Sequence, residues 1–193
     1  GDVLKARDRA WVLSSWQVIV DEYPVMGTEI KITTAAYEFK GFMGMRNFII
    51  ETTDGKRLAW ANSNWTHLVI STGLPARLTP ADTDNYVLSE KMEMDYAPRK
   101  IKLPDSMIPQ ESFAVQKHHL DTNHHVNNCQ YICMAEDFLP EDFKVYQMRA
   151  EYKMQAKLGD TICPKTMTEA GKVVVSLNDE NGKPYAVVEF TEK

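Results

Sequence analysis

Short apolar runs separated by turn residues follow one another along most of the chain. Strand-like runs flank Asp54-Gly55 and, much later, Asn181-Gly182. Asp-Gly and Asn-Gly favour tight hairpins, because type I′ turns need positive φ at both central residues. The pattern therefore predicts antiparallel strands at residues 47–50 and 58–70 around the first turn, and at 172–175 and 185–190 around the second.

The two hairpins belong to a weak internal repeat. Met26–Ile30 resembles Leu158–Ile162 at an offset of 132 residues, measured between Gly27 and Gly159. The hairpin glycines Gly55 and Gly182 are 127 residues apart. Two similar offsets, each bringing one turn signal onto another, predict two antiparallel units in tandem.

A helix is predicted ahead of the strands of the second unit. Apolar residues recur at helical spacing from Cys129 to Phe138, Asn127 or Asn128 supplies an N-cap, and Pro140 marks the end. The offset of 132 places the end of the matching helix near residue 6. We therefore expect the first strand and helix of the first unit to lie mostly upstream of residue 1.

The segment between the two units contains a second helix start and an extended basic stretch. Thr79, Pro80 and Asp82 give a capping hydroxyl, a proline at the first helical position and an acid near the positive end of the helix dipole. We expect a first unit at residues 1–95, a linker at 96–108 and a second unit at 109–193.

Composition narrows the class of protein. The chain of 193 residues has a formal charge of −5 and has no apolar run of membrane-spanning length, so we expect a soluble protein that binds neither membrane nor nucleic acid. Its three cysteines, an odd number without zinc-ligand spacing, predict free thiols in a reducing cytoplasm. We expect no cofactor.

The clearest chemical pattern lies just before the predicted helix. A carboxylate, an amide and an imidazole stand at alternate positions, Asp121, Asn123 and His125. On an extended backbone such side chains share one face, so we expect them to converge beside the N–H groups that open the helix. A base or nucleophile, an orienting amide and oxyanion donors are the groups that acyl transfer requires.

These residues resemble a known signature. Leu120–Tyr131 is similar to the pattern Asp-x-Asn-x-His-Val-Asn-Asn-x-x-Tyr of the acyl-ACP thioesterases, and Ala10–Trp16 and Phe39–Phe48 resemble the first half of that family. The resemblance implies an α+β fold of two tandem hot-dog units, each an antiparallel sheet wrapped around a long helix. It also implies hydrolysis of the thioester between a fatty acyl chain and acyl carrier protein, in a bacterial cytoplasm.

The resemblance carries catalytic roles onto Asp121, Asn123 and His125. Asp121 would attack the carbonyl or deprotonate water, while His125 would orient the reacting group or protonate the departing thiolate. A further family residue, usually Glu, falls at Gln155, and Ala156 stands where plant members have cysteine. Gln155 can orient water but cannot ionise, so it would be a helper.

Other interpretations of the same residues stay open. Asp121 and Asn123 are also common turn and cap residues, and His125 could be a hydrogen-bonded core histidine. Cys129 follows His125 by one helical turn and could act as a nucleophile or simply pack. The histidines invite a metal interpretation, but adjacent histidines on an extended chain face opposite sides; the four are His118, His119, His124 and His125.

The expected partner is acyl carrier protein, with a homodimer as a further possibility. Basic residues could meet the acidic carrier; they are Arg99, Lys100, Lys102, Lys117, Lys153 and Lys157. A few of the aromatic residues and methionines of the first unit could line an acyl tunnel, while most of them are expected to be ordinary core; they are Trp11, Trp16, Phe39, Phe42, Met43, Met45 and Phe48. An acyl-CoA thioesterase of the same fold and a non-catalytic acyl-binding module are the alternatives.

Overall fold

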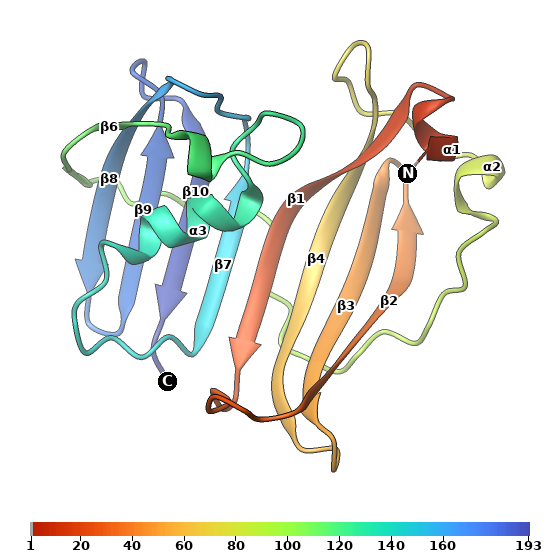
Figure 1. Cartoon of the computed structure of the whole chain (residues 1–193), viewed down its shortest axis with the longest axis horizontal. Helices are drawn as coiled ribbons and strands as arrows, with labels where there is room; N and C mark the ends of the chain where they lie inside the picture. The colour runs from red at the N-terminus through yellow and green to blue at the C-terminus, as the bar shows by residue number, and fades with distance from the viewer. Residues whose placement is uncertain (1) are drawn as a thin grey trace. The chain divides into compact units, whose positions relative to one another are not determined.

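The chain divides into two compact units between Ala97 and Pro98, and the computed structural model describes residues 2–193 (Figure 1). Each unit contains long antiparallel strands and few helices, which confirms the predicted α+β class. Residues 98–108, expected as linker, belong to the second unit.

Unit 1 contains a four-stranded antiparallel sheet in the order β2-β3-β4-β1. Its elements are α1 (Asp2–Lys5), β1 (Arg9–Val20), β2 (Ile30–Lys40), β3 (Met43–Thr52), β4 (Arg57–Val69) and α2 (Pro80–Thr83). The predicted helix start at Thr79 is confirmed, because the Asp82 carboxylate accepts the Thr79 N–H at 3.0 Å and its hydroxyl at 2.6 Å. Helix α1 ends at Lys5, close to the predicted residue 6.

Buried polar side chains hold the segment after α2 against the unit 1 sheet. The Oδ1 of Asn47, a residue 4% exposed, accepts hydrogen bonds from the Met92 N–H and the Tyr96 hydroxyl, both at 3.1 Å. The amide of Gln17 donates to the Asp95 carbonyl at 2.7 Å and accepts from the Ala97 N–H at 2.9 Å. The backbone of this segment therefore finds partners without forming a strand.

Unit 2 contains the sheet β7-β10-β9-β8-β5, with β6 paired to β8. Its elements are β5 (Ile108–Pro109), β6 (Phe113–Ala114), the 3₁₀ turn η1 (Lys117–His119), α3 (Asn128–Glu136), β7 (Gln147–Tyr152), β8 (Thr161–Glu169), β9 (Lys172–Asn178) and β10 (Pro184–Thr191). Helix α3 lies across this sheet (Figure 1) and contacts β9 and β10. It buries Tyr131, Met134 and Ala135, while a separate hydrophobic cluster of unit 2 contains Ile101, Val174 and Val187.

A buried ionic cluster on β7 and β10 holds the first residues of unit 2. The Arg149 guanidinium pairs with Glu189 at 2.6 Å and also donates to the carbonyls of Pro98 and Lys100. Glu151, 3% exposed, accepts the Ile101 N–H at 3.1 Å. The sheet thus fixes the segment that begins at Pro98 through hydrogen bonds from charged side chains to its backbone.

The strand order confirms the predicted tandem repeat. The order β8-β9-β10-β7 in unit 2 repeats the order β2-β3-β4-β1 in unit 1. In the β3–β4 hairpin the Gly55 N–H donates to the Thr52 carbonyl, and in the β9–β10 hairpin the Gly182 N–H donates to the Asp179 carbonyl, both at 3.0 Å. The two hairpin loops therefore have the same hydrogen bond and lie between equivalent strands of the two units.

The predicted turn type is wrong at both hairpins. Type I′ needs positive φ at two residues, but only the glycines have it, 90° at Gly55 and 78° at Gly182. Each loop has three residues, the last of them a glycine in the left-handed region, which is the other common hairpin geometry. The dipeptides marked the positions of the hairpins correctly because glycine meets the requirement of either turn.

Candidate functional site: the Asp121–His125 turn and its neighbours

The motif forms a tight turn, so the expected extended backbone is wrong. The Asp121 N–H donates to the His125 carbonyl at 2.8 Å, and the His124 N–H donates to the Asp121 carbonyl at 3.1 Å. His124 has a φ of 61°, a left-handed conformation that is unusual for a residue other than glycine. Asp121, Asn123 and His125 are brought together by this turn and not by strand alternation.

The carboxylate of Asp121 forms the centre of the turn. Its Oδ1 accepts the N–H of Asn123 at 2.8 Å and of His125 at 3.2 Å, while Oδ2 lies 3.5 Å from the Asn123 side-chain nitrogen. Partial burial raises the pKa of Asp121, but these hydrogen bonds and the neighbouring His125 imidazole outweigh burial and hold the pKa below its usual value. The carboxylate is therefore charged near neutral pH, and Oδ2 is the oxygen less engaged in the turn.

The chain that follows β7 lies against the end of the motif. His125 forms an antiparallel bridge with Lys157, and the Val126 N–H donates to the Ala156 carbonyl at 2.9 Å. Val126 and Ala156 are buried, at 4% and 0% exposure. Because side chains alternate along paired strands, His125 and Gln155 are expected on the opposite, outer face, and His125 is partly exposed and Gln155 exposed.

Helix α3 begins directly after the motif, as predicted. Asn127 is its N-cap, and the cap's side-chain oxygen accepts the Cys129 N–H at 2.9 Å. The Asn127 carbonyl accepts the Gln130 N–H, also at 2.9 Å. The N–H groups of Cys129 and Gln130, which were expected to face a substrate, are thus already bound to Asn127. The N–H of Asn128 is the donor of this first turn that has no partner among residues 2–193.

The cysteines and histidines near the motif do not form a metal cluster in the described part of the chain. Cys129 and Cys133 are exposed on α3. Partial desolvation on the helix surface, followed by the neighbouring Cys129, raises the pKa of the Cys133 thiol. The rings of His118 and His119 pack on each other, with 4.1 Å between centroids, and the Nδ1 of His119 accepts the Gln116 N–H at 2.9 Å.

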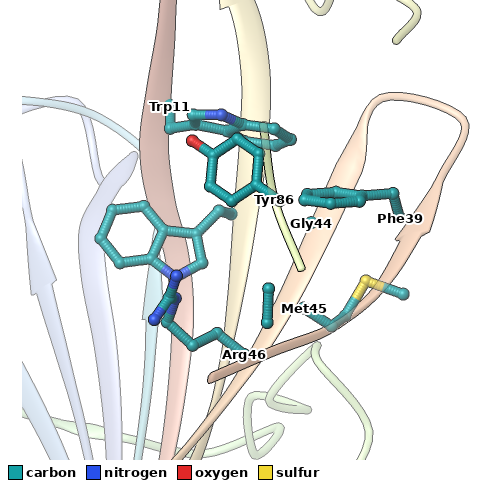
Figure 2. Close-up of a pocket in the computed structure, with 8 residues that line it drawn as sticks. Trp11, Phe39, Gly44, Met45, Arg46 and Tyr86 are labelled. Atoms are coloured by element: carbon teal, nitrogen blue, oxygen red, sulfur yellow. The ribbon is translucent and has the colours of Figure 1, made fainter. Parts of the chain in front are cut away.

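Unit 1 contains an apolar pocket with a volume of about 170 Å³. Figure 2 shows the rings of Trp11, Phe39 and Tyr86 around one space, with Met45 and Arg46 at its border. Its other lining residues are Ala36, Gly44 and Trp65.

The sequence pointed to only part of this lining. Trp11, Phe39 and Met45 were among the residues expected to line a tunnel, whereas Gly44, Trp65 and Tyr86 were not. Gly44 carries a signal that could have found it, because a glycine inside a strand often marks a close approach. A Cβ atom there would lie 3.0 Å from the ring of Trp11 and 3.1 Å from that of Phe39.

Comparisons with known proteins agree with this architecture. Two tandem units with this strand order define a double hot-dog fold. In this chain the second unit also carries polar residues at the turn and at the helix start. Residues 1–86 match the acyl-ACP thioesterase N-terminal domain, and residues 102–189 match the acyl-ACP thioesterase C-terminal domain. The chain belongs to the acyl-ACP thioesterase family.

Individual relatives are distant. Over 169 residues the chain is 25% identical to the chloroplastic acyl-[acyl-carrier-protein] hydrolase of Cuphea viscosissima, covering 80% of this chain and 40% of that protein. Over 160 residues it is 27% identical to the chloroplastic palmitoyl-acyl carrier protein thioesterase of Arabidopsis thaliana, covering 75% and 38%. The chain thus spans about two fifths of the length of these curated relatives.

The fold is also that of a solved acyl-ACP thioesterase. The crystal structure of the protein from Bacteroides thetaiotaomicron has a TM-score of 0.88 at 19% identity, covering 98% of this chain and 79% of that chain. Within residues 2–193, no helix combines the length and the apolarity needed to span a bilayer.

Proposed function

We propose that this chain hydrolyses the thioester between a fatty acyl chain and acyl carrier protein, giving a free fatty acid and the holo-carrier. The observation that carries the proposal is the turn from Asp121 to His125, bound to the 153–157 segment in the unit that matches the family's C-terminal domain. One surface of unit 2 then holds a charged carboxylate, an imidazole, two amides and a helix start. These groups suit attack by water on a polarised carbonyl.

In the proposed reaction, water attacks the thioester carbonyl carbon. The Oδ2 of Asp121 accepts a hydrogen bond from this water, because Oδ1 is occupied by the turn. A carboxylate with a lowered pKa is a weak base, so His125 takes the proton as the C–O bond forms. The charge of Asp121 stabilises the resulting imidazolium, which returns the proton to sulfur when the C–S bond breaks.

The developing oxyanion would be stabilised at the start of α3. The Asn128 N–H is the donor that the N-cap leaves available, and it lies at the positive end of the helix dipole. One such donor typically contributes a factor of about 100 or more to the rate. Asn123 and Gln155 would hold the water or the carbonyl, since their amides both donate and accept.

The aromatic pocket of unit 1 is proposed to bind the acyl chain. Its wall is made of rings and a methionine side chain, which favour methylene groups over water. Arg46, also in the lining, donates a hydrogen bond to the Thr34 hydroxyl at 2.9 Å.

The test of the function is a thiol-release assay on acyl carrier protein loaded with fatty acyl chains. Asp121→Asn keeps an oxygen for the two backbone N–H groups but removes the charge, so we expect near wild-type thermal stability and turnover reduced by about 100-fold or more. Asp121→Ala removes both and should lower stability as well. Unchanged turnover in Asp121→Asn would discard the mechanism.

A non-catalytic acyl-binding role is favoured by one observation, Gln155 at the position where the family usually has an acid. The same assay separates the two roles, because a binding module would retain acyl carrier protein without releasing thiol. Comparing carrier-linked and CoA-linked substrates distinguishes an acyl-CoA thioesterase. A homodimer and a bacterial cytoplasmic location remain predictions.

Docking of the carrier is proposed at exposed basic residues of unit 2. Arg149 holds the backbone beside Arg99 and Lys100, so both side chains point from a fixed segment. Lys157 is exposed and pairs through its backbone with His125. Lys153 is less suitable, because it pairs with Glu151 at 2.9 Å.

Charge reversal tests this surface. Arg99→Glu with Lys100→Glu should raise KM for the carrier-linked substrate far more than for a CoA-linked one, because the carrier presents a broader acidic surface than the phosphates of CoA. Lys165→Glu with Lys183→Glu changes the same charge at other exposed positions of unit 2 and serves as the control. Equal changes in KM for both substrates would remove the docking role.

A further inference from the structure

Two tyrosines, the buried Tyr131 and the partly buried Tyr152, connect α3 with the segment that carries Gln155. Tyr131, in the middle of α3, is 2% exposed, and its hydroxyl oxygen accepts the Ala156 N–H at 2.8 Å. Tyr152, the last residue of β7, donates its hydroxyl to the carbonyl of Asn128, the first residue of α3, at 3.1 Å. The two rings pack at a centroid distance of 6.2 Å.

In both hydrogen bonds the donor lies on β7 or the segment after it and the acceptor lies on α3, but the side chain comes from α3 in the first and from β7 in the second. Tyr131 fixes the segment to the helix, and Tyr152 fixes the helix start to the end of the strand. The Ala156 carbonyl continues the first connection, because it accepts the Val126 N–H at 2.9 Å. Helix, segment and motif are therefore joined in one chain of hydrogen bonds that passes through Ala156.

Both hydroxyl groups remain protonated in this environment. Burial raises the pKa of Tyr131 to about 12 and raises the pKa of Tyr152 still further. A neutral phenol is the form that can accept from one N–H and donate to one carbonyl. The connection therefore persists across the pH range in which a hydrolase works.

We propose that Tyr131 and Tyr152 are positioning residues of the site, which fix Gln155 beside His125 through Ala156. This inference rests on the proposed thioesterase function. The burial of Ala156 explains how the positioning works. Because the Ala156 side chain is fully buried, the side chain of the adjacent Gln155 projects outward, to the face that carries His125. Loss of the Tyr131 hydroxyl would leave the Ala156 N–H buried without a partner and would free Gln155 to move.

The test is a double-mutant cycle between Tyr131→Phe and Gln155→Ala. Tyr131→Phe should lower kcat by about tenfold or more with KM nearly unchanged, and this loss should disappear when Gln155 is already alanine. Tyr152→Phe should act in the same direction. Tyr146→Phe removes a partly exposed hydroxyl elsewhere in unit 2 and should leave kcat unchanged.

A purely structural role of Tyr131 would give the same loss of kcat in both backgrounds, and that result, or an unchanged kcat, would overturn the inference. Amide hydrogen exchange of residues 153–157 provides a readout without turnover. Tyr131→Phe should speed exchange there, and unchanged exchange would overturn the inference even if the wild-type protein released no thiol. Absence of wild-type turnover with accelerated exchange would instead reject the proposed function alone.

Discussion

At the scale of single residues, the site is organised by one carboxylate. Asp121 accepts two backbone N–H groups with one oxygen, and His124 adopts the left-handed conformation that closes the turn. The sequence suggested two roles for Asp121, as a turn residue and as a reactive group, and this geometry is compatible with both. Oδ1 holds the turn, while Oδ2 is less engaged and can meet a reactant. A similarly local feature controls the pocket of unit 1, where Gly44 leaves room for two rings.

Substitution of Gly44 should narrow the pocket. In Gly44→Ala the new methyl group presses on Trp11 and Phe39 at 3.0–3.1 Å, so we expect a shift of preference toward shorter acyl chains and a loss of stability of about 1–3 kcal/mol. A panel of acyl lengths and urea unfolding would measure both. Ile32→Ala, on β2 at 63% exposure and outside the lining, is the control. An unaltered chain-length profile would exclude the pocket from acyl binding.

At the scale of elements, short helices depend on their caps. Nine residues of α3 and four of α2 are too few to be stable as isolated helices, so capping and packing maintain them. Asn127 caps α3, and Asp82 binds the backbone and hydroxyl of Thr79 at the start of α2. The N-caps were predictable because they depend on neighbours within three residues.

The cap of α2 should make stability depend on pH. The Thr79 hydroxyl, opposed by burial, holds the pKa of Asp82 below its usual value. This stabilisation is present above the unfolded pKa of about 3.9 and is lost as pH falls through the lower folded pKa. Asp82→Asn should flatten the loss of thermal stability below about pH 4. An acid profile identical to that of the wild type would contradict this role.

At the scale of the whole molecule, the two units repeat one topology with different chemistry. The unit 1 sheet holds a polar segment through Asn47 and Gln17, whereas unit 2 uses the ion pairs of Arg149 and Glu189. Buried charges of this kind are costly to leave unpaired. The ion-paired Arg149 therefore holds the backbone of the segment that begins at Pro98, a contact that the sequence of this segment does not predict.

Removing one partner of this cluster should weaken unit 2. The side chains of Arg149 and Glu189 are 13% and 7% exposed, so Arg149→Met leaves a buried carboxylate with only Lys172 and should cost about 3–5 kcal/mol. It should also accelerate proteolysis at residues 98–101, which lose two hydrogen bonds. The double variant Arg149→Met with Glu189→Met should recover much of the stability. A double variant no more stable than the single one would refute the explanation.

The sequence by itself determined the two hairpins, the tandem repeat, the helix starts at Thr79 and Asn127 and the family signature, because hydrophobic periodicity, glycine turns and caps act over a few neighbouring residues. Tertiary structure decided what these elements bring together. The pairing of His125 with Lys157, the hydrogen bond between Ala156 and Tyr131 and the assembly of Gly44, Trp65 and Tyr86 into a pocket depend on contacts between distant segments. Such contacts follow from the register of strands and the packing of buried side chains, which no local pattern specifies.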